Sequence, residues 1–132
     1  MPSKALTLGA DGLWPDYNNG SYPQFCGEGL PFSMDAITDL VPKMRVFWPS
    51  LYNSDESFWS HEWEKHGRCC TQYFQDQHDY FSSILTLRSK IDLLSALSAM
   101  NVVPSSQGYL LGTVMTAIKA KYGHLPVVTC NK

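Results

Sequence analysis

The spacing of apolar residues from position 34 onward constrains the fold most strongly. It follows the 3.6-residue period of an α-helix in five separate stretches. These stretches predict helices over residues 34–47, 58–66, 71–89, 91–97 and 110–122. Pro49, Gly67 and Gly123 end three of them, because proline cannot continue a helix and glycine suits the left-handed conformation that closes one.

Strand patterns are few and lie near the two ends of the chain. Residues 6–8 and 127–129 have strand-like composition, whereas residues 9–33 are rich in Gly, Pro, Asn and Asp and predict loops. We therefore expect an α+β fold in which helices dominate and the sheet is small and incomplete. A chain of 132 residues, 44% of them hydrophobic, suffices for one core, so we predict a single domain over residues 1–132.

The charge balance limits how such a chain could contact nucleic acid. Its formal net charge is -2. A protein that binds nucleic acid by broad neutralisation of phosphates carries a basic stripe, so any RNA contact here must be local. No apolar run approaches the roughly 20 residues that span a bilayer, and no hydrophobic leader follows Met1. We expect neither a membrane span nor a secretion signal in this sequence.

The cysteines leave the redox environment open. The sequence contains four of them: Cys26, Cys69, Cys70 and Cys130. They could form two disulfides in three different pairings, and their spacing does not choose among these. Asn19 begins an Asn-Gly-Ser glycosylation motif, which with the cysteines favours an oxidising compartment. The missing hydrophobic leader instead favours free thiols in a reducing compartment.

The stretch from residue 58 to 67, Phe-Trp-Ser-His-Glu-Trp-Glu-Lys-His-Gly, is the most informative for function. At about 100° per helical residue, five of its side chains fall within one arc of roughly 140°. They are Phe58, His61, Glu62, Lys65 and His66. Two imidazoles, a carboxylate and an ammonium on one face are the groups that general acid–base catalysis at a phosphate requires. Lys65 can offset charge on phosphoryl oxygens, and Glu62 can orient an imidazole or receive a proton.

Two other interpretations fit the same residues. Glu62 with His66, and His61 with Lys65, have the i,i+4 spacing of stabilising pairs on a solvated helix. Four side chains could instead bind zinc: His61, His66, Cys69 and Cys70. The zinc interpretation is the weaker one, because the two histidines are one residue further apart than in a zinc-protease helix.

Several motifs resemble the ribonuclease T2 family, especially its plant self-incompatibility-type branch. The stretch at 58–67 with Cys69 resembles the second active-site segment of that family, and Gly12-Leu13-Trp14-Pro15-Asp16-Tyr17 resembles the first. Three shorter stretches also fit, at residues 22–26, 47–51 and 126–130. The resemblance runs along nearly the whole chain and implies a ribonuclease T2-like α+β fold with a small antiparallel sheet.

The resemblance implies a reaction and a set of catalytic residues. Family members are secreted or vacuolar endoribonucleases that cut single-stranded RNA through a 2′,3′-cyclic phosphate without a cofactor or metal. His66 would be the general base that takes the 2′-hydroxyl proton. Glu62 and Lys65 would support the transition state, and His61 would hold the phosphate. The expected partner is therefore single-stranded RNA, bound by a monomer outside any membrane.

The resemblance also implies base-binding residues and one disulfide. Trp14, Asp16 and Tyr22 match residues that contact one base, and Phe58 matches an aromatic residue at a second base site. The family disulfide corresponds to Cys26 and Cys69, and it would stabilise the fold by about 3 to 4 kcal/mol. Cys70 and Cys130 have no partners assigned by the resemblance.

One departure from the family pattern bears directly on activity. The family's first segment begins with a histidine, the general acid that protonates the leaving 5′-oxygen, but this chain has Asp11 there. An ordinary aspartate has a pKa near 3.9, so at neutral pH it has no proton to give and adds negative charge beside the phosphate. Losing one positioned acid removes about 10²- to 10⁴-fold of rate.

The other departures concern the ends and one cysteine. Relative to the family, an N-terminal strand and a C-terminal strand are missing, and Asn53 lies near the place of a usual cysteine. We therefore expect a divergent member, truncated at both ends, whose RNA cleavage is strongly impaired. The alternative is a non-catalytic relative that binds RNA or protein or serves in storage.

Overall fold

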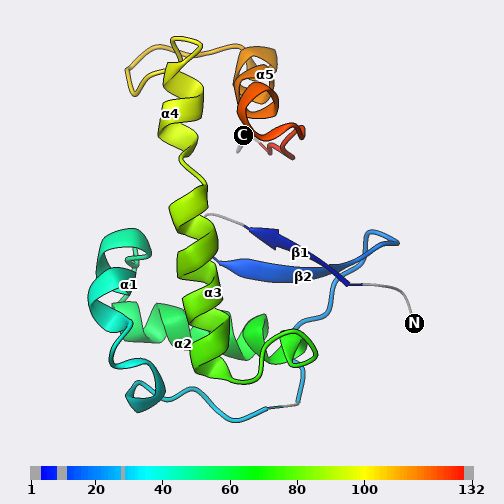
Figure 1. The fold of residues 1–132 in the computed structure, drawn as a ribbon, viewed down its shortest axis with the longest axis vertical. Helices are drawn as coiled ribbons and strands as arrows, with labels where there is room; N and C mark the ends of the chain where they lie inside the picture. The colour runs from blue at the N-terminus through cyan, green and yellow to red at the C-terminus, as the bar shows by residue number, and fades with distance from the viewer. Residues whose placement is uncertain (1–3, 9–11, 28, 130–132) are drawn as a thin grey trace. The chain divides into compact units, whose positions relative to one another are not determined.

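The computed structural model describes residues 4–8, 12–27 and 29–129. Its first elements are two antiparallel strands, β1 (Lys4–Leu8) and β2 (Leu13–Tyr17) (Figure 1). Helices follow in the order η1 (Asp35–Ile37, 3₁₀), α1 (Val41–Phe47), α2 (Asp55–Lys65), η2 (Gly67–Cys70, 3₁₀), α3 (Gln77–Lys90), α4 (Leu93–Ser98) and α5 (Leu111–Tyr122). The predicted helix-rich α+β class with a small antiparallel sheet is confirmed.

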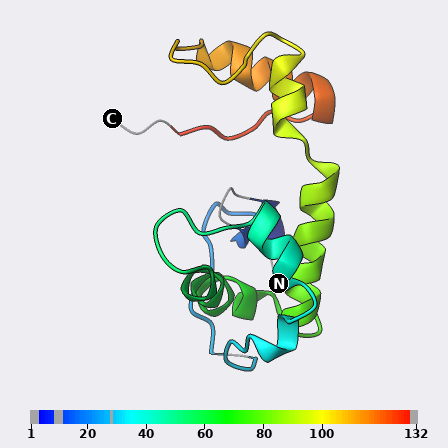
Figure 2. The ribbon, with the colours of Figure 1, turned by 90° about the vertical axis from the view of Figure 1, so that its left-hand side faces the viewer.

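The chain divides into two compact units, residues 1–89 and 90–132. The single domain that we expected from length therefore stays a prediction. Within the first unit, α1 and α3 lie side by side (Figures 1 and 2) and enclose a groove of about 280 Å³ lined by Leu40, Phe47 and Leu85 among others. In the second unit α4 packs on α5, and the hydroxyl of Tyr122 accepts a hydrogen bond from the Asp92 backbone N–H at 2.7 Å.

Aromatic side chains of α2 and α3, together with Trp48 just after α1, dominate the core of the first unit. Its fully or nearly fully buried members are Leu13, Ile37, Met44, Trp48, Trp59, Trp63, Cys70, Tyr80, Phe81 and Ile84. The polar ends of these rings are satisfied by backbone carbonyls. Trp59 Nε1 donates to the carbonyl of Trp48 at 2.9 Å, and the hydroxyl of Tyr80 donates to the carbonyl of Leu13 at 2.9 Å. The second bond joins α3 to β2, and it thereby fixes the strand that carries Trp14.

Two of the predicted helices are shorter than their apolar pattern suggested. Residues 38–40 form turns, and α1 begins only at Val41, because Pro42 would clash with the preceding turn of a longer helix and suits the first turn of a new one. Residues 71–73 likewise form a turn, and α3 begins only at Gln77. The Asp76 carboxylate accepts the backbone N–H of Asp79 at 2.8 Å, which caps the start of that helix.

Two strand assignments were wrong. Residues 13–17 form β2 although they lie in the stretch 9–33 whose Gly, Pro, Asn and Asp content predicted loops, and Pro15 pairs with Leu6 in this two-stranded sheet. Residues 127–129 are not a strand. Among the described residues the sheet contains only β1 and β2, so the backbone of 127–129 has no strand partner to pair with. The predicted strand at 6–8 is confirmed as part of β1.

None of the described helices combines the length and the apolar character needed to cross a membrane.

Candidate active site

Helix α2 positions the predicted catalytic side chains. Ser54 caps its N-terminus by accepting the backbone N–H of Ser57 at 3.2 Å, so the helix begins at Asp55, three residues before the predicted start. The side chains of the predicted catalytic face differ in how deeply they are buried. Glu62 and His66 are buried, with exposed fractions of 3% and 5%, whereas Lys65 is half-buried and His61 is exposed. The solvated-helix interpretation therefore fails for Glu62 and His66.

Trp14 of β2 joins these two buried groups. Its indole Nε1 donates a hydrogen bond to Glu62 Oε2 at 2.9 Å. Its ring stacks on the imidazole of His66, with ring centroids 4.6 Å apart and planes 13° from parallel. The two sequence segments that carried the family resemblance, 48 residues apart at Trp14 and Glu62, therefore meet in one cluster.

Gly12 allows the backbone before β2 to approach this cluster closely. A Cβ at that position would lie 2.6 Å from Glu62 Oε2 and 3.0 Å from the ring of Trp48. Real Cβ atoms do not approach other atoms this closely, so only glycine fits without a shift of its neighbours. Asp11, the next residue toward the N-terminus, lies outside the described residues.

The environment of His66 keeps its ring neutral. Burial, and then the positive charges of Lys65 and His61, lower the pKa of His66 from the usual 6.5 to about 4. Among the described residues, none hydrogen-bonds to its buried Nε2 atom. Above about pH 4 the imidazole is therefore mostly unprotonated, which is the form that a general base requires.

The opposite face of α2 holds the loop at residues 29–33. Trp63 Nε1 donates to the carbonyl of Leu30 at 2.8 Å, and the Glu64 carboxylate accepts the backbone N–H of Phe32 at 2.9 Å and pairs with Arg68. Gly67 packs against this face. A Cβ there would lie 2.4 Å from the Trp63 ring. Gly67 is thus required by space and not, as predicted, by a left-handed helix end, since α2 ends at Lys65 and η2 follows at once.

A disulfide ties the loop after β2 to the C-terminal end of α2. Cys26 and Cys69 are bonded, with their Cα atoms 5.1 Å apart, which confirms the pairing implied by the resemblance. Cys70 is buried and is not disulfide-bonded, and its thiol donates a weak hydrogen bond to the carbonyl of His66 at 3.5 Å. Cys130 lies outside the described residues. The zinc interpretation loses Cys69 as a ligand. Within the described part of the chain, no three His, Cys, Asp or Glu side chains gather as metal ligands would.

The residues predicted to bind bases are dispersed in the structure. Trp14 is 37% exposed and belongs to the buried cluster as much as to the surface. Phe58 is half-buried and packs edge-on against Trp48, with centroids 6.1 Å apart. Tyr22 is 60% exposed, and Asp16 is half-buried on β2.

The predicted glycosylation residue Asn19 is exposed in the turn after β2, where its side chain accepts two hydrogen bonds from Ser21.

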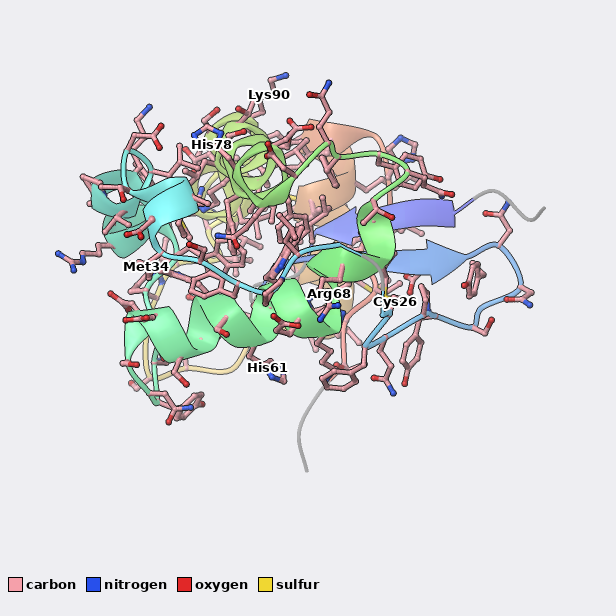
Figure 3. All side chains as sticks on the ribbon, turned by 90° about the horizontal axis from the view of Figure 1, so that it is seen from below. Cys26, Met34, His61, Arg68, His78 and Lys90 are labelled. Carbon is pink, nitrogen blue, oxygen red and sulfur yellow. A yellow bond between two sulfur atoms is a disulfide. The ribbon has the colours of Figure 1, made fainter. Side chains whose placement is uncertain are left out.

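Phe25 is a neighbour of the site that the sequence interpretation did not select. Its ring lies edge-on to the imidazole of His61, with centroids 6.3 Å apart. Figure 3 shows His61 projecting from α2 toward solvent, near the loop that carries Cys26. The signals in the sequence are that Phe25 lies in the family-like stretch 22–26 and precedes a cysteine of the predicted disulfide.

The model of the ribonuclease T2 family matches residues 1–132 of this sequence. The chain belongs to the ribonuclease T2 family. Extracellular ribonuclease LE of Solanum lycopersicum is 41% identical over 130 residues, covering 96% of this chain. Intracellular ribonuclease LX of the same plant is 37% identical over 124 residues, covering 91%. The crystal structure of RNase NT in complex with 5′-AMP superposes with a TM-score of 0.81 at 38% identity, over 92% of this chain.

This member of the ribonuclease T2 family spans little more than half the length of these relatives. It covers 56% of ribonuclease LE, 51% of ribonuclease LX and 60% of RNase NT. The family and fold are thus shared, and the cluster around Trp14 lies within the shared part. The activity, substrate and location of this chain are therefore proposals.

Proposed function

We propose that this chain binds single-stranded RNA and cleaves it slowly, through attack of a ribose 2′-oxygen on the adjacent phosphorus. The proposal depends most on the Trp14–Glu62–His66 cluster, in which the buried imidazole is held neutral and its Nε2 has no hydrogen-bond partner among the described residues. Relatives that are ribonucleases, and a related structure solved with 5′-AMP, support RNA as the substrate class.

His66 would act as the general base. It removes the proton of the 2′-hydroxyl while the 2′-oxygen forms a bond to phosphorus, and the bond to the 5′-oxygen breaks to leave a 2′,3′-cyclic phosphate. Lys65 and His61 lie close enough to His66 to lower its pKa, so their side chains are placed to offset charge on the same phosphate. Glu62, held by Trp14, would orient the cluster.

The departing 5′-oxygen needs a proton, and this step is where the chain is impaired. Asp11 occupies the sequence position of the general acid, and an ordinary carboxyl group is ionised at neutral pH. The leaving group must then depart unprotonated or take its proton from water. We expect a rate about 10²- to 10⁴-fold below that of a chain with an imidazolium there.

The Asp11→His substitution tests this proposal. Cleavage of a fluorophore-labelled single-stranded RNA at pH 7 should be weak in the wild-type chain and rise about 10²- to 10⁴-fold in Asp11→His. His66→Ala should abolish the gain in the Asp11→His background. Equal rates for wild type and Asp11→His would contradict the impairment.

The second candidate is a non-catalytic RNA-binding relative, and the aspartate at position 11 is the observation that favours it. The same experiment separates the two candidates, because a non-catalytic relative would bind the labelled RNA and leave it intact even when it carries the Asp11→His substitution.

For either candidate, the Cys26–Cys69 disulfide supports an extracellular or vacuolar location, since disulfides persist mainly in oxidising compartments.

A further inference from the structure

Phe25 has a backbone conformation that its side chain does not favour. Its φ angle is 51°, in the left-handed region, and Asn101 is the only other non-glycine residue with a positive φ in the described part of the chain. Asparagine tolerates this region, whereas a bulky aromatic residue is a genuine outlier there. Burial does not explain the strain, because 61% of Phe25 is exposed. Residues held in such conformations cluster at functional sites.

Three contacts hold the strained residue beside the end of α2. The backbone N–H of Phe25 donates to the carbonyl of Lys65 at 2.9 Å. The next residue, Cys26, is bonded to Cys69, and the Phe25 ring meets the edge of the His61 imidazole. An exposed apolar ring is thus fixed next to two of the groups expected to contact phosphate, His61 and Lys65.

Trp14 and Phe58 are less available to a ligand than Phe25. One face of Trp14 is covered by His66, and Phe58 is half-buried against Trp48. Phe25 and Tyr22 have the most exposed rings on the segment between β2 and the disulfide. A base stacks on any accessible aromatic face, with little dependence on its identity.

We infer that Phe25 is a nucleobase-stacking residue, which receives the base of a nucleotide whose phosphate lies at His61 and Lys65. The inference rests on the proposed RNA-binding function and adds a contact to it. The strained backbone directs the ring toward the site, and the disulfide and the bond to Lys65 keep it there before RNA binds. Because the ring is already held in place before RNA binds, little conformational entropy is lost on binding, and the contact contributes to affinity.

The affinity for a non-cleavable probe tests the inference. A fluorescein-labelled 2′-O-methyl oligoribonucleotide of about six residues lacks the attacking hydroxyl, so binding can be followed by anisotropy without turnover. Phe25→Leu should raise the Kd about 5- to 100-fold, and Phe25→Trp should bind as the wild type does. Phe47→Leu is the matched control, because Phe47 is 53% exposed and lines the groove between α1 and α3.

Probes that lack one base separate stacking from an effect through His61. If Phe25 stacks on a base, the penalty of Phe25→Leu disappears when that base alone is missing from the probe. A penalty that is the same for every abasic probe would mean that Phe25 only positions His61, and would overturn the inference. Phe25→Asn gives an independent measure, since asparagine relieves the backbone strain and lacks a stacking ring. It should retain or raise the Tm and still weaken binding.

The failure of the inference differs from the failure of the proposed function. Tight binding of the probe by both the wild type and Phe25→Leu would refute the stacking role alone. No binding of any single-stranded probe by the wild-type chain would refute the RNA-binding function, and the role of Phe25 with it.

Discussion

Gly12 shows how a single residue sets the geometry of the site. The sequence marks it as the first residue of a motif shared with the family, but in the structure its backbone lies against the Glu62 carboxylate. A side chain there would push Glu62 from the position in which it accepts the Trp14 indole hydrogen. No propensity rule predicts this requirement, because it comes from two segments that meet only after folding.

We expect Gly12→Ala to destabilise the first unit. Forcing a methyl group to within 2.6 Å of a buried carboxylate oxygen should lower the free energy of unfolding by about 1 to 3 kcal/mol. Urea unfolding followed by tryptophan fluorescence measures the change, since all four tryptophans lie before residue 89. Gly27→Ala is the control, because a Cβ at Gly27 meets nothing within 4 Å. Equal losses in the two variants would refute the close approach.

The protonation states of two residues predict an acidic pH optimum for cleavage. The productive form has His66 neutral and Asp11 protonated. With a His66 pKa of about 4 and an ordinary aspartate pKa near 3.9, about a fifth of molecules have this form at pH 4 and about one in a thousand at pH 7. The kcat/KM of the wild type should therefore peak near pH 4 and fall about 300-fold by pH 7.

Replacing Asp11 by histidine should move that optimum upward. An ordinary imidazole near pKa 6.5 keeps its proton up to that pH, so Asp11→His should have its maximum between about pH 4 and 6.5. A pH series of kcat/KM from pH 3 to 8 for both proteins tests this. An unchanged optimum would show that residue 11 does not supply the proton.

At the scale of elements, the helices were largely predictable and the sheet was not. The α5 helix ends at Tyr122 with Gly123 in the left-handed conformation, as its apolar period and glycine indicated. Helix α2 was placed within three residues at each end. The strand β2 was missed, because Pro15 and Asp16 suggest a turn unless a partner strand, here β1, is known to lie beside them.

The Cys26–Cys69 disulfide couples two elements, and its removal gives a prediction. It closes a loop of 43 residues, so the double variant Cys26→Ser, Cys69→Ser should lose about 4 kcal/mol of unfolding free energy. Urea denaturation under non-reducing conditions measures the loss. Reducing agent should destabilise the wild type by the same amount and leave the double variant unchanged. A loss below about 1 kcal/mol would show that the bridge adds little to stability.

For the whole molecule, His66 links stability to pH. Its pKa is lowered on folding to about 4, so between pH 4 and 6.5 the unfolded chain binds more protons than the folded one. The stability due to the neutral ring is complete above pH 6.5 and is lost as the pH falls toward 4, by on the order of 3 kcal/mol.

His78 acts in the opposite direction at the surface. Its hydrogen bond to Asp39 raises the pKa of His78, so this contribution is present below the unfolded pKa and is lost as the pH rises through the folded one. Urea midpoints at pH 4.5, 5.5 and 7 should rise with pH in the wild type and less steeply in His66→Gln. His78→Gln is the control, and a wild-type slope retained in His66→Gln would contradict the assignment.

The sequence by itself determined the helix-rich class, the family, the cysteine pairing by resemblance, and the set of acid, base and cationic groups on α2. These features follow from the helical spacing of apolar residues and from short sequence motifs. Both can be recognised without knowing which distant residues become neighbours in the fold. Only the tertiary structure decided which of those groups are buried, because burial depends on what packs against a helix face. Trp14 covers Glu62 and His66, and that contact makes a neutral base of an imidazole that an isolated helix would leave solvated.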